Sequence, residues 1–153
     1  MIENQLNSGL DEHDMGKETI PESHRHLLAG PVNVVLTTVL PDGQPQTTPI
    51  WCNLEGDNVL INTMKGFRKE KNMRLNPKVT LLAYRLKEPH INIEVRGEVI
   101  EMTEQGALEH LNELNMLYCK TPNFFGDSID AKLIHKFTPV KIKIKPTRVR
   151  DEG

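Results

Sequence analysis

The chain has 153 residues, of which 37% are hydrophobic and 26% are charged, and its formal net charge is −2. This length predicts one domain, and the slightly acidic balance gives no reason to expect a nucleic-acid partner. The sequence has no apolar run long enough to span a membrane and no signal peptide at its start, so we expect a cytoplasmic protein without membrane attachment. Cys52 and Cys119 lie too far apart for a metal or redox motif, so we expect free thiols and no metal site.

The beginning of the chain divides into a tail and the start of a domain. Residues 1–19 are polar, acidic and without periodicity, which predicts a mobile tail ahead of a domain over residues 20–153. A short helix is predicted over residues 20–30, because Pro21 suits a first helical turn and Gly30 suits a C-terminal cap.

Three strands joined by close turns come next. Residues 32–39 are rich in β-branched side chains and predict a buried strand, and the turn that follows predicts residues 46–53 as its hairpin partner. A second turn leads to a third strand over residues 59–63, so the three strands form an antiparallel meander. Pro49 lacks a backbone donor, which indicates an edge strand or a bulge at that point. Trp51 is interpreted as a core residue in preference to a ligand contact.

Two further strands are predicted over residues 79–85 and 91–100, and the second of them contains Gly97. A glycine inside a strand indicates a bulge or a close approach of another backbone. A final strand is predicted over residues 139–150, where apolar residues alternate with lysines. Six mostly antiparallel strands with short helices predict a small barrel, because closure removes exposed sheet edges.

Helix and loop segments lie between the last two strands. Thr103 is predicted as the N-cap of an amphipathic helix, on which His110 is expected to be solvated or to cap the helix. Residues 119–130 predict a loop in which Phe124 and Phe125 would either cover a planar ligand or pack onto the barrel. A short helix is predicted near residues 131–136.

The stretch over residues 61–74 combines a strand end, a turn at Gly66 and a polar helix. Between residues 65 and 74 it carries a local charge of +4 that comes from five cations and one anion: Lys65, Arg68, Lys69, Lys71 and Arg74 against Glu70. A cationic strand-to-helix junction can bind a phosphate. The same pattern is also typical of a solvated helix face, and the spacing does not separate the two interpretations.

Motifs for other chemistries are missing from the sequence. It contains no glycine-rich dinucleotide or phosphate loop, no zinc-protease motif and no nucleophile elbow. The six histidines are scattered, and no pair of carboxylates forms an acid–base couple, so no catalytic residue is identified. One anion-binding junction with few acid–base groups favours chemistry carried by a bound cofactor.

With these elements placed, residues 20–150 resemble the pyridoxamine 5'-phosphate oxidase-like, FMN-binding split-barrel superfamily. Within it, the chain is most similar to the F420-dependent (deazaflavin) oxidoreductases. The resemblance rests on short pieces in a shared order, at residues 20–21, 27–28, 36–38, 42–46, 48–51, 61–63, 68–79, 94–97 and 145–149.

The resemblance implies a six-stranded antiparallel split β-barrel and a homodimer whose two cofactor sites lie at the interface. It implies that the cofactor phosphate is held by Asn62, Thr63, Arg68 and Lys69. It also implies that the strand over residues 47–51 lies along the ring system, where the residues concerned are Thr47, Thr48, Pro49, Ile50 and Trp51. The oxidases carry a basic residue and a glutamine where this chain has Thr47 and Glu94, which disfavours oxidation of pyridoxamine phosphate.

Three functions follow as hypotheses. The first is an oxidoreductase that passes a hydride from reduced F420 to a small unsaturated acceptor, with Lys65, Lys71 and Arg74 along the acidic tail of the cofactor. The second is the same fold with FMN, and the third is a flavin- or haem-binding protein without turnover. The substrate is not predicted, because loops 86–90 and 119–130 and the partner chain would shape its pocket.

Overall fold

The structure is a computed structural model that describes residues 18–153. Of the predicted tail over residues 1–19, residues 1–17 therefore lie outside the described part. No helix within residues 18–153 is long and apolar enough to cross a membrane. Both cysteines are free thiols, Cys52 buried and Cys119 exposed.

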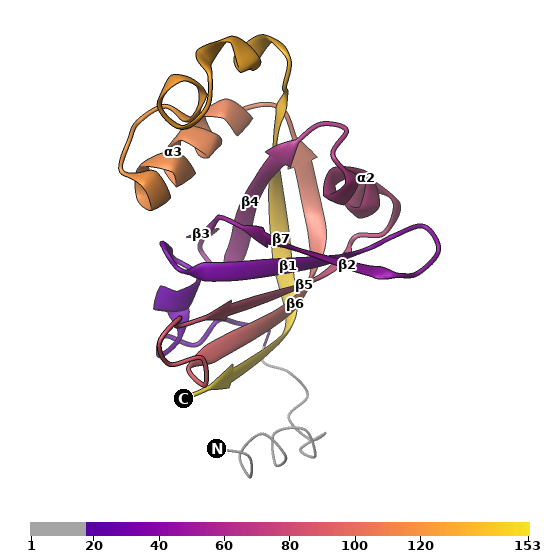
Figure 1. Cartoon of the computed structure of the whole chain (residues 1–153). Coiled ribbons are helices and arrows are strands. Elements are labelled where there is room, and N and C mark those ends of the chain that lie inside the picture. Colours follow the sequence, from indigo (N-terminus) through magenta and orange to yellow (C-terminus); the bar gives the residue numbers. More distant parts are fainter. Residues whose placement is uncertain (1–17) are drawn as a thin grey trace.

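Seven strands form one antiparallel sheet that curls into a split barrel (Figure 1). The strand order is β2-β1-β5-β6-β7-β4-β3. The bounds are β1 (Asn33–Val39), β2 (Pro45–Ile50), β3 (Cys52–Glu55), β4 (Asn58–Met64), β5 (Lys78–Tyr84), β6 (Asn92–Thr103) and β7 (Pro139–Glu152).

The sheet has seven strands, and not the six that were predicted, because one predicted strand is divided in two. The strand predicted over residues 46–53 is divided at Trp51 into β2, which pairs with β1, and β3, which pairs with β4. These two short strands form the opposite edges of the sheet, so Trp51 alone connects the two edges between which the barrel is open. β2 is an edge strand, as Pro49 predicted.

Gly97 lies at a β-bulge and also close to a neighbouring backbone, so both features that the sequence suggested there are confirmed. The register between β6 and β7 shifts between Arg96 and Gly97, which is a bulge. A Cβ atom at Gly97 would also lie 2.7 Å from the backbone oxygen of Lys145 and 2.7 Å from Cγ2 of Ile144. No larger residue fits there without moving the backbone of β7.

The helical segments are α2 (Arg68–Leu75), α3 (Ala107–Cys119), η1 (Arg25–Leu27), η2 (Phe124–Ser128) and η3 (Ala131–His135). The helix expected over residues 20–30 is reduced to the single 3-10 turn η1, a form common in short segments. The expected N-cap at Thr103 is wrong, because β6 stays paired with β7 through Thr103 and α3 begins only after Gly106. Figure 1 shows α3 and α2 on either side of the upper end of β4.

The interior of the barrel is apolar. Its fully buried side chains come from strands β1, β4, β5, β6 and β7, among them Leu36, Ile61, Leu81, Ile93, Val140, Ile142 and Ile144. A smaller cluster of Met64, Leu111 and Phe125 fixes α3 and η2 beside the barrel. The core therefore holds β4, α2 and α3 in fixed positions around the split.

Candidate functional site

A cavity of about 490 Å³ lies at the split of the barrel. One wall comes from the end of β2 with Pro49 and Ile50, and the opposite wall from β4 with Asn62 and Thr63. Residues of β1, β5, α2, α3 and η2 complete it, so the cavity lies where the two edges of the sheet meet the helices. Its size is within the usual range for small-molecule and cofactor sites.

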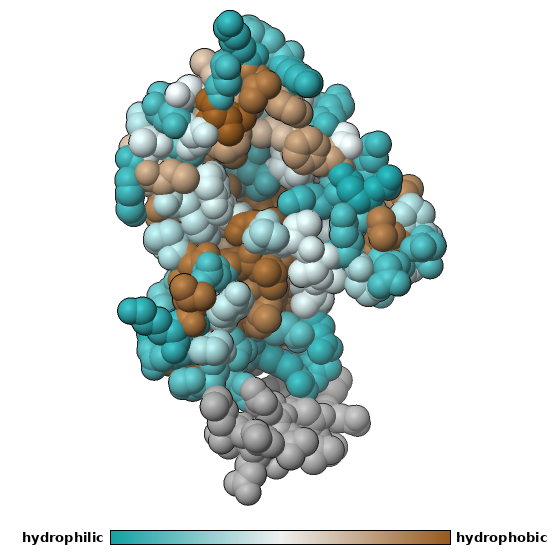
Figure 2. Space-filling view, viewed as in Figure 1, coloured by the Kyte–Doolittle hydropathy of each residue, from teal (hydrophilic) through white to brown (hydrophobic). Residues whose placement is uncertain are grey.

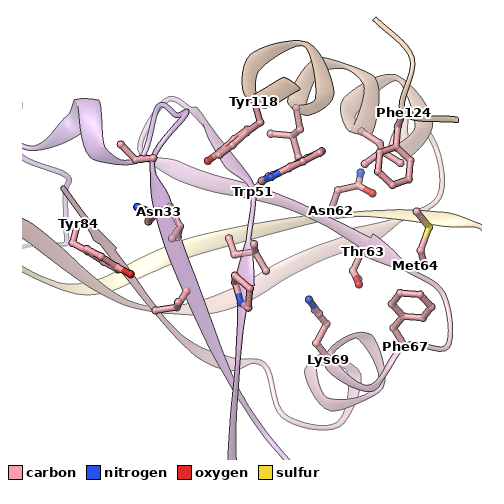
Figure 3. A pocket seen from close by; sticks show the side chains of 17 residues that line it. Asn33, Trp51, Asn62, Thr63, Met64, Phe67, Lys69, Tyr84, Tyr118 and Phe124 are labelled. Atoms are coloured by element: carbon pink, nitrogen blue, oxygen red, sulfur yellow. The ribbon is translucent and has the colours of Figure 1, made fainter. Parts of the chain in front are cut away.

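One end of the cavity is cationic. Figure 3 shows the amine of Lys69 and the hydroxyl of Thr63 directed toward the same part of the cavity. Lys69 is half-buried, and burial lowers the pKa of its ammonium group. No carboxylate among residues 18–153 pairs with it, whereas Lys65 contacts Glu104 at 3.0 Å. A half-buried cation without a counter-ion, next to a hydroxyl donor, is suited to bind an anion.

Glu70 orders the turn that carries Lys69. It is buried and accepts hydrogen bonds from the backbone N–H of Gly66 (3.1 Å) and from the guanidinium of Arg74. Asn72, also buried, donates to Thr38 Oγ1 (3.1 Å) and Gln46 Oε1 (3.2 Å), which ties α2 to the β1–β2 hairpin. The only anion of the cationic stretch thus has a structural partner and does not face the cavity.

The predicted site residues separate into two groups. Those that line the cavity are Pro49, Ile50, Trp51, Asn62, Thr63 and Lys69. Thr47, Thr48 and Arg68 do not line it: Arg68 is exposed at the start of α2, and the hydroxyl of Thr47 lies 2.8 Å from that of Thr37.

An aromatic wall forms the middle of the cavity. The interpretation of Trp51 as a core residue is wrong, because it is half-buried and lies outside the core clusters. Its ring stacks on Tyr118 with ring centroids 5.3 Å apart and meets Phe124 edge-on at 6.2 Å. Tyr118 Oη accepts from the N–H of Cys52 (3.2 Å) and donates to its carbonyl (3.3 Å), and burial raises the pKa of Tyr118 to about 12. Of the phenylalanine pair, Phe124 lines the cavity and Phe125 is buried beside α3.

His110 is a residue whose surroundings the sequence did not predict. It is 2% exposed, so the expected solvated or capping role is wrong. Its Nδ1 lies 3.1 Å from Asn62 Nδ2, and its Nε2 lies 2.9 Å from Asn53 Oδ1. Burial, and then the nearby charge of Lys141, lower the pKa of His110 to about 4, against a smaller opposing effect of Glu55.

Tyr84 is a cavity residue that the sequence did not single out. It lies on β5 beside Asn33 of β1, at the end of the cavity away from Lys69 (Figure 3). Its hydroxyl makes no hydrogen bond to any other residue of the described chain. The alternation of inward and outward positions along β5 could have predicted that Tyr84 points out of the barrel. Nothing in the sequence, however, placed that face of β5 at the cavity.

One protein family matches the chain over most of its length. Residues 20–150 match the family described as pyridoxamine 5'-phosphate oxidase. No curated protein matches the chain.

Solved structures are similar over most of the chain. A protein named F420 reductase is 27% identical, with 86% of this chain and 98% of that one covered and a TM-score of 0.71. A conserved hypothetical protein from Mycobacterium tuberculosis is 19% identical, covering 88% and 86%, with a TM-score of 0.65. General stress protein 26 from Bacillus anthracis is 22% identical, covering 86% and 92%, with a TM-score of 0.61. The last two similarities concern the fold alone.

Proposed function

The chain belongs to the pyridoxamine 5'-phosphate oxidase family, and on this basis we propose that it is an oxidoreductase that binds reduced F420 and reduces a small unsaturated acceptor. One observation carries the proposal. The half-buried ammonium of Lys69 lacks a carboxylate partner among the described residues and faces the same cavity as the aromatic wall of Trp51 and Phe124. The similarity to a protein named F420 reductase supports the choice of cofactor.

The residues present fit a cofactor of this kind. Lys69 and Thr63 would bind its phosphate, and Trp51 with Ile50 would hold the flat ring and exclude water from it. When bound, the reduced cofactor supplies the hydride. The contribution of the chain is to fix the ring beside the acceptor in one orientation.

FMN remains the alternative cofactor, and one finding favours it. Of the three surface cations expected along the acidic tail of F420, Lys65 pairs with Glu104 and Arg74 pairs with Glu70. Only Lys71 makes no ion pair with another described residue. The phosphate end and the ring wall suit FMN equally well.

A binding experiment separates these possibilities. The purified protein is titrated with reduced F420 and with FMN while its visible spectrum is recorded, and the loaded protein is then offered quinones, enones and a tetrapyrrole. Tight binding of F420 with reduction of one acceptor supports the proposal. Binding of FMN alone supports the alternative, and binding without turnover supports a carrier that does not catalyse.

We further propose a homodimer whose partner chain completes the cavity. Val35 of β1 stands between Pro49 of β2 and Leu82 of β5, so the three form an apolar row across the sheet, and Leu82 is 37% exposed. Figure 2 shows apolar side chains gathered on this face, over β1 and β5 and below α3. Val35 and Pro49 also line the cavity, so a second copy on this face would cover its open side. The mass in solution, measured by light scattering, tests the dimer.

Tyr84 is the residue that we expect to supply the proton. The cavity also contains the phenol of Tyr118, but its hydroxyl is hydrogen-bonded to the backbone N–H and carbonyl of Cys52. Tyr84→Phe removes one oxygen and keeps the ring, so the affinity for the cofactor should stay unchanged while kcat for acceptor reduction falls about a hundredfold, the low end of what a general acid contributes. An unchanged kcat in the Phe variant would contradict the assignment.

A further inference from the structure

The side-chain amide of Asn62 is held in one orientation by α3. Its Nδ2 donates to the carbonyl oxygen of Ala107 at 2.9 Å and lies 3.1 Å from Nδ1 of His110. A backbone carbonyl can only accept a hydrogen bond, so the end of the amide that faces Ala107 must be the nitrogen. The two amide hydrogens are then both directed to α3.

The same contact between Asn62 and His110 fixes the protonation state of the His110 ring. Because Asn62 Nδ2 donates, Nδ1 of His110 must be an unprotonated acceptor. The ring is therefore neutral, and its hydrogen is on Nε2, from which it donates to Asn53 Oδ1 at 2.9 Å. The lowered pKa of His110 agrees with this neutral form at physiological pH.

One polar atom of Asn62 remains for a ligand. Its Oδ1 is buried and has no hydrogen-bond partner among the described residues. Figure 3 shows Asn62 on the cavity wall between Trp51 and Phe124, with this oxygen directed toward the side of Phe124 and Met64. A buried acceptor without a partner is costly, so a ligand that brings a donor to it gains affinity. The ionised oxygens of a phosphate offer only lone pairs.

We propose that Ala107 and His110 hold Asn62 as a hydrogen-bond acceptor, so that Asn62 binds a hydroxyl or N–H in the uncharged part of the ligand. The phosphate is then left to Lys69 and Thr63. This inference rests on the proposed function, and it assigns Asn62 a different part of the cofactor from the one that the family resemblance implies. His110 acts through Asn62 and is a positioning residue.

Removing the phosphate from the ligand tests the assignment. By titration of the full chain, FMN is compared with riboflavin, which lacks only the phosphate. F420 is compared with the deazaflavin that has the same ring and ribityl chain but lacks both the phosphate and the acidic tail. Asn62→Leu should lower the affinity for both ligands of the pair that binds, the one with the phosphate and the one without, by the same factor of about ten. Lys69→Ala should lower the affinity only for the ligand that carries the phosphate. A loss in Asn62→Leu that is confined to the phosphate-bearing ligand would overturn the inference.

Two variants of His110 test the positioning role. His110→Asn keeps an acceptor near the place of Nδ1, so its affinity for the phosphate-free ligand should stay within about twofold of the wild type. His110→Leu removes that acceptor and should lower the affinity for the phosphate-free ligand about tenfold. Thermal unfolding of both variants shows whether they are folded. Equal losses in two folded variants overturn the positioning role, and failure of the wild-type chain to bind any of the four ligands overturns the proposed function and this inference with it.

Discussion

Replacing Lys69 by alanine should weaken the binding of the phosphate-bearing cofactor by about 1.5–3 kcal/mol, which is about 10- to 150-fold in Kd. The reason is that Lys69 is the half-buried cation of the cavity and has no carboxylate partner among the described residues, so the ligand phosphate would be its counter-ion. The stability of the free protein should not fall, since removing an unpaired, half-buried charge breaks no ion pair. A titration of the variant with FMN and F420 measures the change.

A neighbouring cation on the same helix provides the control. Lys71 is exposed on α2 and does not line the cavity, so Lys71→Ala should change the affinity for FMN little. Equal losses in the Lys69 and Lys71 variants would indicate a general charge effect and would contradict a specific phosphate contact.

The pH dependence gives a second test of the same residue. Burial lowers the pKa of Lys69 below 10.5, and the phosphate binds the charged form. Affinity should therefore be lost, as the pH rises, before an ordinary lysine would lose its proton. Lys69→Arg keeps its charge at alkaline pH and should retain affinity there. If the affinities of the wild type and Lys69→Arg fall in parallel, titration of Lys69 is not the cause.

The sequence predicted the fold through local patterns. Pro49 predicted an edge strand, Gly97 predicted a bulge, and the close turns predicted the antiparallel meander. The division of one strand into β2 and β3 could not be predicted in this way. Both halves are extended, and the change of partner at Trp51 is decided by how the whole sheet curls.

The candidate site could be predicted only where its residues are adjacent in the sequence. Thr63 and Lys69 belong to one short junction and meet in the cavity, but a charge pattern does not say that Arg68 faces away. His110 lies 48 residues from Asn62. Its burial was predictable from its spacing on α3, because Ala107, His110 and Leu111 lie at positions i, i+3 and i+4.

Acidification should destabilise the protein through His110. Its pKa is about 4 in the folded chain and near 6.5 in the unfolded chain, so between these values the unfolded state binds the proton more strongly. The free energy of unfolding should therefore fall as the pH drops from 6.5 to 4, by about 3 kcal/mol from this residue, and not fall further on its account below pH 4. Chemical denaturation at a series of pH values measures this change.

Two variants separate His110 from the carboxylates that titrate in the same range. His110→Asn cannot take up the proton and should show a smaller loss of stability between pH 6.5 and 4 than the wild type. Lys141 faces His110 from β7 and lowers its pKa, whereas Glu55 on β3 raises it. Lys141→Gln should therefore bring the pKa of His110 closer to 6.5 and also reduce the loss, because the folded state then accepts the proton more readily. A loss of the same size in the wild type and in His110→Asn would show that the buried network around Asn62 does not exclude the proton.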